Sequence, residues 1–417
     1  MPRRARRNGP FLLATFAVAG LLLAYVVGWP LVSAWLAPPR ALVARPLLAP
    51  LAAQIPIRLF EFFILAWLFV FGSCIGSFLN VVVYRTPRRL SLWGSSFCPR
   101  CRVRIPARDN LPVFGWLKLR GRCRTCRLPI SPRYPLVELT VGLVILVLAT
   151  LEILLAAVNL PDAGERAPLR LGISWLIGHP RWDLIGICVL HSGLVCVLLS
   201  WALIRHDGYA VPRRYALGAL VAAWLLVGLE PLWRLAIWQQ RPVAWQAWLA
   251  AWAADERGLW GLLGGLLVGA VTGVGCLLAS RPAGKSPAGP LPESAQVALP
   301  QRVAPTWREK FADALLGFGL VGVSLGWPAA VSVGLLAAAA RLLGALTLGL
   351  SPRFRPLPLL AYTCLAAFVQ LCLWRVWDGW AFWPGSSTGL PTFAAVLTMV
   401  LVLSWQAGVL ERLVSTP

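Results

Sequence analysis

The sequence predicts an all-α polytopic membrane protein with about ten transmembrane helices and a small cytoplasmic insertion that contains four cysteines. Of its 417 residues, 58% are hydrophobic and 13% are charged, and the mean hydropathy is +0.71. This composition is typical of a polytopic membrane protein and excludes an ordinary soluble domain. The Lys and Arg residues behind the net charge of +23 concentrate in short loops between apolar runs. The charge therefore indicates orientation in a lipid bilayer, and we expect no nucleic-acid partner.

The first six apolar runs each approach the roughly 20 residues that a helix needs to cross a bilayer. The first run, residues 11–36, follows the basic segment MPRRARR. A signal peptide is the alternative, but the run is longer than the apolar core of a signal peptide and lacks a clear cleavage site. We therefore expect a transmembrane helix there. The next five predicted spans are residues 60–83, 134–158, 184–204, 215–238 and 259–280.

A segment rich in Pro, Ala, Gly and Ser, residues 281–310, follows and predicts a flexible cytoplasmic linker. The apolar run 311–350 would be roughly 60 Å long as one helix, which is twice the thickness of the hydrocarbon core. It must therefore break, and Gly326, Trp327 and Pro328 mark the predicted position. The last two predicted spans are residues 357–377 and 392–410.

These elements divide the chain into five predicted regions. Residues 1–58 carry an extra N-terminal transmembrane helix and loop, and residues 59–140 form an N-terminal domain whose cysteine module occupies residues 84–133. The other regions are the two halves of a transmembrane core and the linker between them, at residues 141–280, 311–417 and 281–310.

The distribution of charge predicts which helix ends face the cytoplasm. The loop 85–133 contains thirteen Lys or Arg residues and one acidic residue, Asp109, whereas the alternate loops are more balanced. By the positive-inside rule, the N-terminus and the cysteine module are cytoplasmic. We expect the cysteines of this module to remain reduced, since disulfides are rare in the cytosol.

Four cysteines form two CxxC pairs in this basic stretch. The first pair, Cys98 and Cys101, is separated by 21 residues from the second pair, Cys123 and Cys126. Two such pairs can supply four thiolates to one tetrahedral zinc ion, and the metal then acts as the core of a module too small to fold alone. Two disulfides or four unrelated thiols are the alternatives. The spacing favours a structural zinc site in a zinc-ribbon-like module.

The segments around the cysteines carry further motifs: GSFLNVVVYR at residues 76–85, FCPRC, DNLPVFGWLKLRGRCRTC at 109–126 and SPRYPLVEL at 131–139. These segments resemble the N-terminal domain of prepilin peptidases, the type IV leader peptidases. The resemblance implies a multi-pass aspartic protease of the bacterial inner membrane that cleaves prepilin leaders at the cytoplasmic face, for type IV pili or type II secretion. It also implies N-methylation of the new pilin N-terminus with S-adenosylmethionine, which many members perform.

Both positions at which this family carries its catalytic aspartates hold other residues. The first aspartate opens a D-x-D-x-x-x-[LI]-P motif, and the segment IRHDGYAVP places Arg205 there, while Asp207 retains the third position. The second aspartate ends a GxGD motif, and the segment GFGL places Leu320 there. Leucine cannot ionise and arginine stays protonated, so neither can activate water.

The resemblance therefore implies an impaired or inactive protease-like protein, and three alternatives stay open. Asp207 and Asp313 lie near cytoplasmic span ends and could act as relocated acids in an active peptidase. A methyltransferase could be retained. A non-enzymatic membrane scaffold could bind pilin-like segments. Inside the fourth span, His191 is expected to make a hydrogen-bonded helix contact.

Overall fold

A computed structural model of the chain confirms an all-helical architecture. The structure describes residues 20, 22–24, 51–155, 157–161, 182–232, 258–279, 306–348, 357–378, 380 and 390–415. Across these ranges the only extended pairings are two isolated β-bridges, Phe97 with Arg104 and Arg122 with Pro129. The chain divides into two compact units, which are Met1–Ser77 with Ser95–Leu146, and Phe78–Gly94 with Val147–Pro417.

Unit 1 contains most of the long helix α4 (Leu51–Arg85), the cysteine module and the first part of α6 (Arg133–Ala149). The module includes two short helices, η2 (Ala107–Asp109) and α5 (Phe114–Lys118). Helices α4 and α6 approach closely because small residues line their contact. A Cβ atom at Gly76 would lie 2.7 Å from Cα of Glu138, and one at Gly72 would lie 3.0 Å from Cα of Gly142. Such contacts between small residues are typical of helix packing in membranes.

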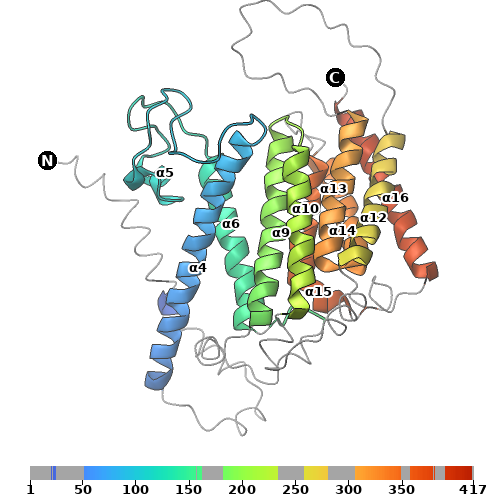
Figure 1. Cartoon of the computed structure of the whole chain (residues 1–417), viewed down its shortest axis with the longest axis horizontal. Coiled ribbons are helices and arrows are strands. Elements are labelled where there is room, and N and C mark those ends of the chain that lie inside the picture. Colours follow the sequence, from blue (N-terminus) through green and yellow to red (C-terminus); the bar gives the residue numbers. More distant parts are fainter. Residues whose placement is uncertain are drawn as a thin grey trace, which may run out of the picture. The chain divides into compact units, whose positions relative to one another are not determined.

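Unit 2 is a bundle whose helices run side by side (Figure 1). Its long helices are α9 (Trp182–His206), α10 (Arg213–Leu232), α12 (Gly258–Ala279), α13 (Trp307–Leu325), α14 (Trp327–Leu348), α15 (Leu359–Asp378) and α16 (Leu390–Ser415). Helix α13 lies deep in this bundle, because every residue from 317 to 325 is buried. Glycines allow α12 and α13 to touch: a Cβ atom at Gly265 would collide with the carbonyl of Phe318, and one at Gly322 would collide with Gly261.

The predicted break in the run 311–350 is confirmed. Helix α13 ends at Gly326, whose φ of 94° and ψ of 164° belong to a region that only glycine adopts readily, and α14 begins at Trp327. Pro328 falls in the first turn of α14, where its missing N–H costs no helical hydrogen bond.

Seven helices of the described part of the chain are long and apolar enough to cross a membrane. They lie at Ile55–Arg85, Arg133–Leu154, Leu184–His206, Trp260–Ala279, Trp327–Thr347, Leu359–Asp378 and Pro391–Glu411. Helices α10 and α13 occupy the places of two further predicted spans and carry charged residues in their first turns. The predicted first span, residues 11–36, and positions 233–238 of the fifth lie almost entirely outside the described residues.

The linker prediction needs one correction. Helix α13 begins at Trp307, so the last four residues of the predicted linker 281–310 are helical. The reason is a capping box: the Thr306 hydroxyl accepts a hydrogen bond from the Glu309 N–H, and the Glu309 carboxylate accepts one from the Thr306 N–H. Glu309 thereby enters a helix and acquires a fixed position.

Candidate functional site

The four cysteines of unit 1 converge. Their Sγ atoms all lie within 4.8 Å of one another, and all four are free thiols. In a tetrahedral site with metal–sulfur distances of about 2.3 Å, neighbouring sulfurs are about 3.8 Å apart, and the Sγ atoms of Cys98 and Cys126 are 3.9 Å apart. The donor set and its spacing therefore fit a metal ion.

The two CxxC segments have the same local conformation. The N–H of Arg102 donates to the carbonyl of Cys98 at 2.8 Å, and the N–H of Arg127 donates to that of Cys123 at 3.0 Å. Both arginines have a φ of 60°, a left-handed conformation that turns each loop back on itself.

Backbone N–H groups also point toward sulfur: that of Cys126 is the largest of several contributions that lower the pKa of the Cys123 thiol to about 7. A thiol with this pKa readily supplies the thiolate that a metal binds. The Leu128 N–H acts in the same direction on Cys126, but burial and the neighbouring thiols raise the pKa of that thiol to about 11.

An ion pair between the buried Asp109 carboxylate and the exposed Arg124 side chain holds the segment between the two cysteine pairs. Asp109 accepts two hydrogen bonds from Arg124, from Nε at 2.5 Å and from Nη2 at 2.6 Å, and Lys118 Nζ lies 3.9 Å away. The hydrogen bonds from Arg124 hold the pKa of the Asp109 carboxyl below its usual value. Gly115 passes so close to this aspartate that an added Cβ atom would collide with the Asp109 carbonyl. A second tie, from the N–H of Val113 to Glu138 Oε2 at 2.7 Å, joins the module to α6.

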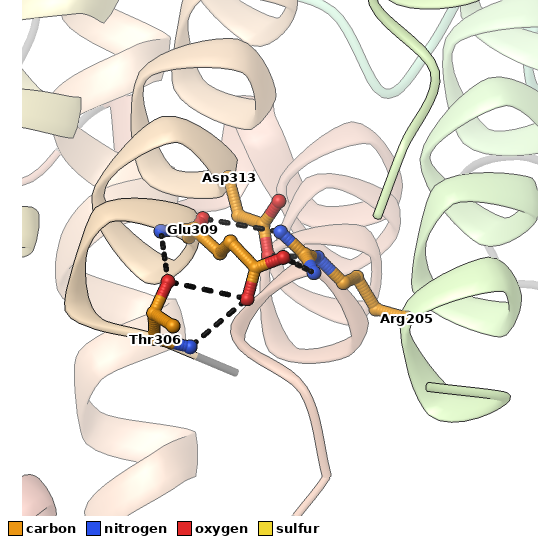
Figure 2. A network of polar contacts seen from close by, with 4 residues as sticks. All are labelled: Arg205, Thr306, Glu309 and Asp313. Carbon is orange, nitrogen blue, oxygen red and sulfur yellow. Dashed lines mark hydrogen bonds and ion pairs between the residues drawn. The ribbon is translucent and has the colours of Figure 1, made fainter. Parts of the chain in front are cut away.

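A second charged cluster lies in unit 2, where the C-terminal end of α9 meets the N-terminal end of α13 (Figure 2). Arg205 Nε lies 2.6 Å from Asp313 Oδ2, and Nη1 lies 3.5 Å from Glu309 Oε1. Nη2 also donates to the Glu309 carbonyl at 3.3 Å. The side chains of Arg205 and Asp313 are 7% and 8% exposed, whereas that of Glu309 is 38% exposed. The Arg205–Asp313 contact is thus a buried ion pair with a more exposed second acid beside it.

The loop that follows α9 is held by an aromatic contact. The Arg88 guanidinium lies 4.2 Å from the Tyr84 ring centroid and 4.6 Å from that of Tyr209. Tyr209 lies four residues after Arg205, beyond the turn at Gly208, whose φ is 86°. These cation–π contacts fix the segment that leaves the Arg205 site.

The motif places Leu320 at the second acid position, but the α13 side chains that contact Arg205 are those of Glu309 and Asp313. Leu320 is seven residues beyond Asp313 on α13, which places it on the same face but about 10 Å deeper, and it is 2% exposed. Of the two α13 carboxylates that contact Arg205, Asp313 is the buried one, and it is one of the two candidate substitute acids. The other, Asp207, lies in the turn after α9, where its Oδ1 atom is 3.7 Å from Nδ1 of His206.

Glu309 was not predicted as a site residue, because the predicted linker 281–310 included it. A signal for it was present: Thr306 and Glu309 form the T-x-x-E pattern of a capping box just before an apolar run. That pattern predicts a helix start four residues before the apolar run and places Glu309 and Asp313 on one helix face.

Comparisons with known proteins give a consistent result. The profile of the bacterial peptidase A24 N-terminal domain matches residues 70–151. A prepilin leader peptidase/N-methyltransferase of Aeromonas salmonicida is 30% identical over 242 residues, which cover 50% of this chain and 80% of the relative. The protein of the same name from Myxococcus xanthus is 37% identical over 174 residues, 37% of this chain and 51% of the relative. The one from Klebsiella pneumoniae is 46% identical over 103 residues, 23% of this chain and 43% of the relative.

The chain thus spans about half the length of the Myxococcus and Klebsiella relatives that it matches. No solved structure matches the chain.

Proposed function

This chain belongs to the prepilin leader peptidase/N-methyltransferase family, and we propose that it is a catalytically impaired member, in which an arginine–aspartate ion pair replaces the pair of catalytic acids. The observation that carries the proposal is the 2.6 Å contact between Arg205 and Asp313. Arg205 stands at the first acid position of the family motif, and Asp313 is the carboxylate that faces it. We therefore assign the second acid position to Asp313 in place of Leu320.

The chemistry of an aspartic protease explains why this pair is inactive. Two carboxylates must share one proton, so that one activates water while the other donates to the peptide carbonyl. Arginine stays protonated and carries only hydrogen-bond donors, so it cannot act as the general base. The same guanidinium lies 2.6 Å from the Asp313 carboxylate, so the site holds an ion pair in place of two carboxylates that share a proton.

The assignment has a direct test in one substitution. Arg205→Asp places two carboxylates opposite each other, and we expect weak cleavage of a prepilin leader by the purified full chain in detergent. The unmodified chain should not cleave. Arg205→Asn removes the positive charge without adding an acid, and it should stay inactive. Leu320→Asp adds an acid about 10 Å too deep and should also stay inactive.

Two results would contradict the proposal. Cleavage by the unmodified chain that is lost in Asp313→Asn or Asp207→Asn would mean that relocated acids are active. Cleavage by the Arg205→Asp, Leu320→Asp double variant and not by Arg205→Asp alone would return the second acid position to Leu320.

The metal, the partners and the orientation are further parts of the proposal. We assign structural zinc to Cys98, Cys101, Cys123 and Cys126, because four thiolates are its preferred closed set. The module and the N-terminus would face the cytoplasm of the bacterial inner membrane, as the basic loop 85–133 favours. Prepilin-like leader segments are the proposed partners, since the relatives' names specify prepilin leaders.

Methyl transfer is a second candidate activity, because the relatives are also named N-methyltransferases. The loss of the acid pair would not abolish it, since methyl transfer from S-adenosylmethionine needs no aspartate dyad. Transfer of labelled methyl groups to a synthetic mature pilin N-terminus measures this activity directly. If neither cleavage nor methyl transfer occurs and pilin segments still bind, the protein is a membrane scaffold.

A further inference from the structure

A second polar site lies inside unit 2, away from Arg205. Glu152 is fully buried and projects from the π-helix η3 (Thr150–Leu154), which continues α6. Its Oε1 atom lies 2.7 Å from Nδ1 of His191 on α9 and 3.2 Å from Nδ2 of Asn159. His191 precedes Arg205 by 14 residues, or about 21 Å along α9, so the two sites are distinct.

The backbone around Glu152 departs from regular structure in two places. The π-helix shifts Glu152 away from the position that an α-helix would give it, and such π-helical turns occur frequently at functional sites. Ala157, which is fully buried, has a φ of 59°, a left-handed conformation that is unfavourable for alanine. Strained backbone persists where the surrounding structure maintains it, often around a ligand.

Two buried oxygen atoms of this cluster have no hydrogen-bond partner in the described part of the chain: Oε2 of Glu152 and Oδ1 of Asn159. The orientation of the Asn159 amide is fixed, because its nitrogen donates both to Glu152 Oε1 and to the carbonyl of Leu371, the latter at 2.8 Å. Both unpartnered atoms are acceptors, and acceptors left alone in an apolar interior are unfavourable. The cluster therefore needs a donor or a positive charge.

Among the described residues, the side chains around the cluster do not supply that charge. The titratable groups that face Glu152 are His191 and Cys188 on α9 and Cys372 on α15. Within the described ranges, His191 is the ionisable group at ion-pair distance from the carboxyl, and it contacts Oε1, which leaves Oε2 open. Arg375 approaches with its backbone N–H, 2.9 Å from the Asn159 carbonyl, while its side chain is exposed.

Apolar residues form a buried cluster beside Asn159 in the sequence and on α9. Ala157 and three further buried side chains form one cluster, against which Trp374 packs: Leu160, Leu184 and Ile187. An ionised carboxylate in such surroundings requires compensation, because burial of an isolated charge is costly.

We propose that Glu152 and Asn159 bind one small cation, a proton or a sodium ion, within the membrane-spanning part of unit 2. Carboxylate and amide oxygens are hard ligands, which suits an alkali cation and excludes a preference for a soft metal. A proton on Glu152 would equally convert one unpartnered acceptor into a donor. His191 is a positioning residue, because its hydrogen bond to Oε1 directs Oε2 toward the bound cation.

The test is thermal unfolding of the purified full chain in detergent, monitored by tryptophan fluorescence. The first arm compares sodium chloride with choline chloride at pH 8, and the second arm lowers the pH from 8 to 6 in choline chloride. We expect the Tm to rise by roughly 2 to 4 °C in one of the two arms, since a ligand that binds only the folded state stabilises it. A rise with sodium identifies the alkali cation, and a rise in the second arm alone identifies the proton.

Glu152→Gln should abolish this response, since it keeps the shape of the side chain and removes the charge. Glu61→Gln is the matched control and should retain it: Glu61 is 8% exposed and lies on α4, 3.1 Å from Arg58. If Glu152→Gln does not fold, Asn159→Ser replaces it and should weaken the response. A wild-type chain that responds in neither arm overturns the proposal, and so does a response that persists in the Glu152 and Asn159 variants.

Discussion

The cysteine module of unit 1 and the Arg205 site of unit 2 differ in how closely their residues match those that the family's chemistry requires. In the module, all four thiols converge within 4.8 Å, and Asp109 and Arg124 brace the segment between them. At the second site the ends of α9 and α13 meet, and Arg205 pairs with Asp313 where we propose that the family carries its two acids. Under the proposed function, the chain retains a complete set of four candidate metal ligands but lacks the pair of catalytic acids.

The two sites differ in how their geometry arises. The two CxxC loops lie within 29 residues of sequence, and each builds its turn from its own backbone hydrogen bonds. The Arg205 site joins residues of α9 and α13 that lie more than one hundred positions apart in the sequence. The proposed function implies that a helical frame persists while the chemistry at its centre is replaced. Four predictions test how far this difference extends, beginning with the largest effect.

The first prediction concerns the metal. Cys98→Ser removes one of four thiolates, and we expect the bound metal to be lost and the module to unfold. Structural zinc contributes about 10 to 16 kcal/mol to the folding of small metal-dependent modules, so this is the largest effect expected here. Elemental analysis of the purified chain measures it. Cys74→Ser, at an exposed cysteine of α4, is the control and should retain the metal. A disulfide between the pairs in the wild-type chain would refute the prediction.

The second prediction concerns the buried ion pair. Arg205→Ala leaves Asp313 buried without its partner, and we expect a loss of about 3 to 5 kcal/mol in the free energy of unfolding. Glu309→Ala should cost less than about 1 kcal/mol, because that carboxylate is 38% exposed and screened by water. Denaturant or thermal unfolding in detergent measures both. Equal effects of the two substitutions would show that the pair does not behave as a buried one.

The third prediction is the pH dependence of the Asp109 brace. Its folded-state pKa is lowered by Arg124, so its contribution to stability is present above the unfolded-state value of about 3.9 and is lost as the pH falls through the folded value. Asp109→Asn should therefore be less stable than wild type by a constant amount from pH 7 to about pH 5. The difference should shrink below about pH 4. Amide hydrogen exchange of the module at each pH measures this difference in stability between the wild-type chain and the Asp109→Asn variant. A difference that grows in acid would reverse the assigned sign.

The smallest expected effect is at the start of α13. Thr306→Ala removes the hydroxyl of the capping box, and a loss of about 1 kcal/mol is expected. Thr398→Ala is the control, because its exposed hydroxyl donates to the Ala394 carbonyl inside α16 and caps nothing. If Thr306→Ala also weakens the Arg205–Glu309 contact in a double-mutant cycle, the cap helps to position the acid site. If the two variants unfold identically, the Thr306 hydroxyl does not stabilise the start of α13, and the prediction is wrong.

The sequence by itself determined the elements whose signals are local. Apolar runs of bilayer length predicted the membrane helices, and the sequence Gly326-Trp327-Pro328 predicted the break between α13 and α14. The CxxC spacing predicted four converging thiols, because a few backbone turns suffice to bring them together. Each of these signals lies within one helix or one short segment.

The tertiary structure alone decided which residues of distant helices face each other. A motif count placed Leu320 opposite Arg205, but the register of α13 against α9 presents Asp313, about two helical turns earlier. Glu152, His191 and Asn159 likewise gave no joint signal, since they lie on separate segments and meet only in the bundle. The physical reason is that helix register depends on packing over the whole interface, such as the glycine contacts of α12 with α13, and a single-residue pattern does not encode it.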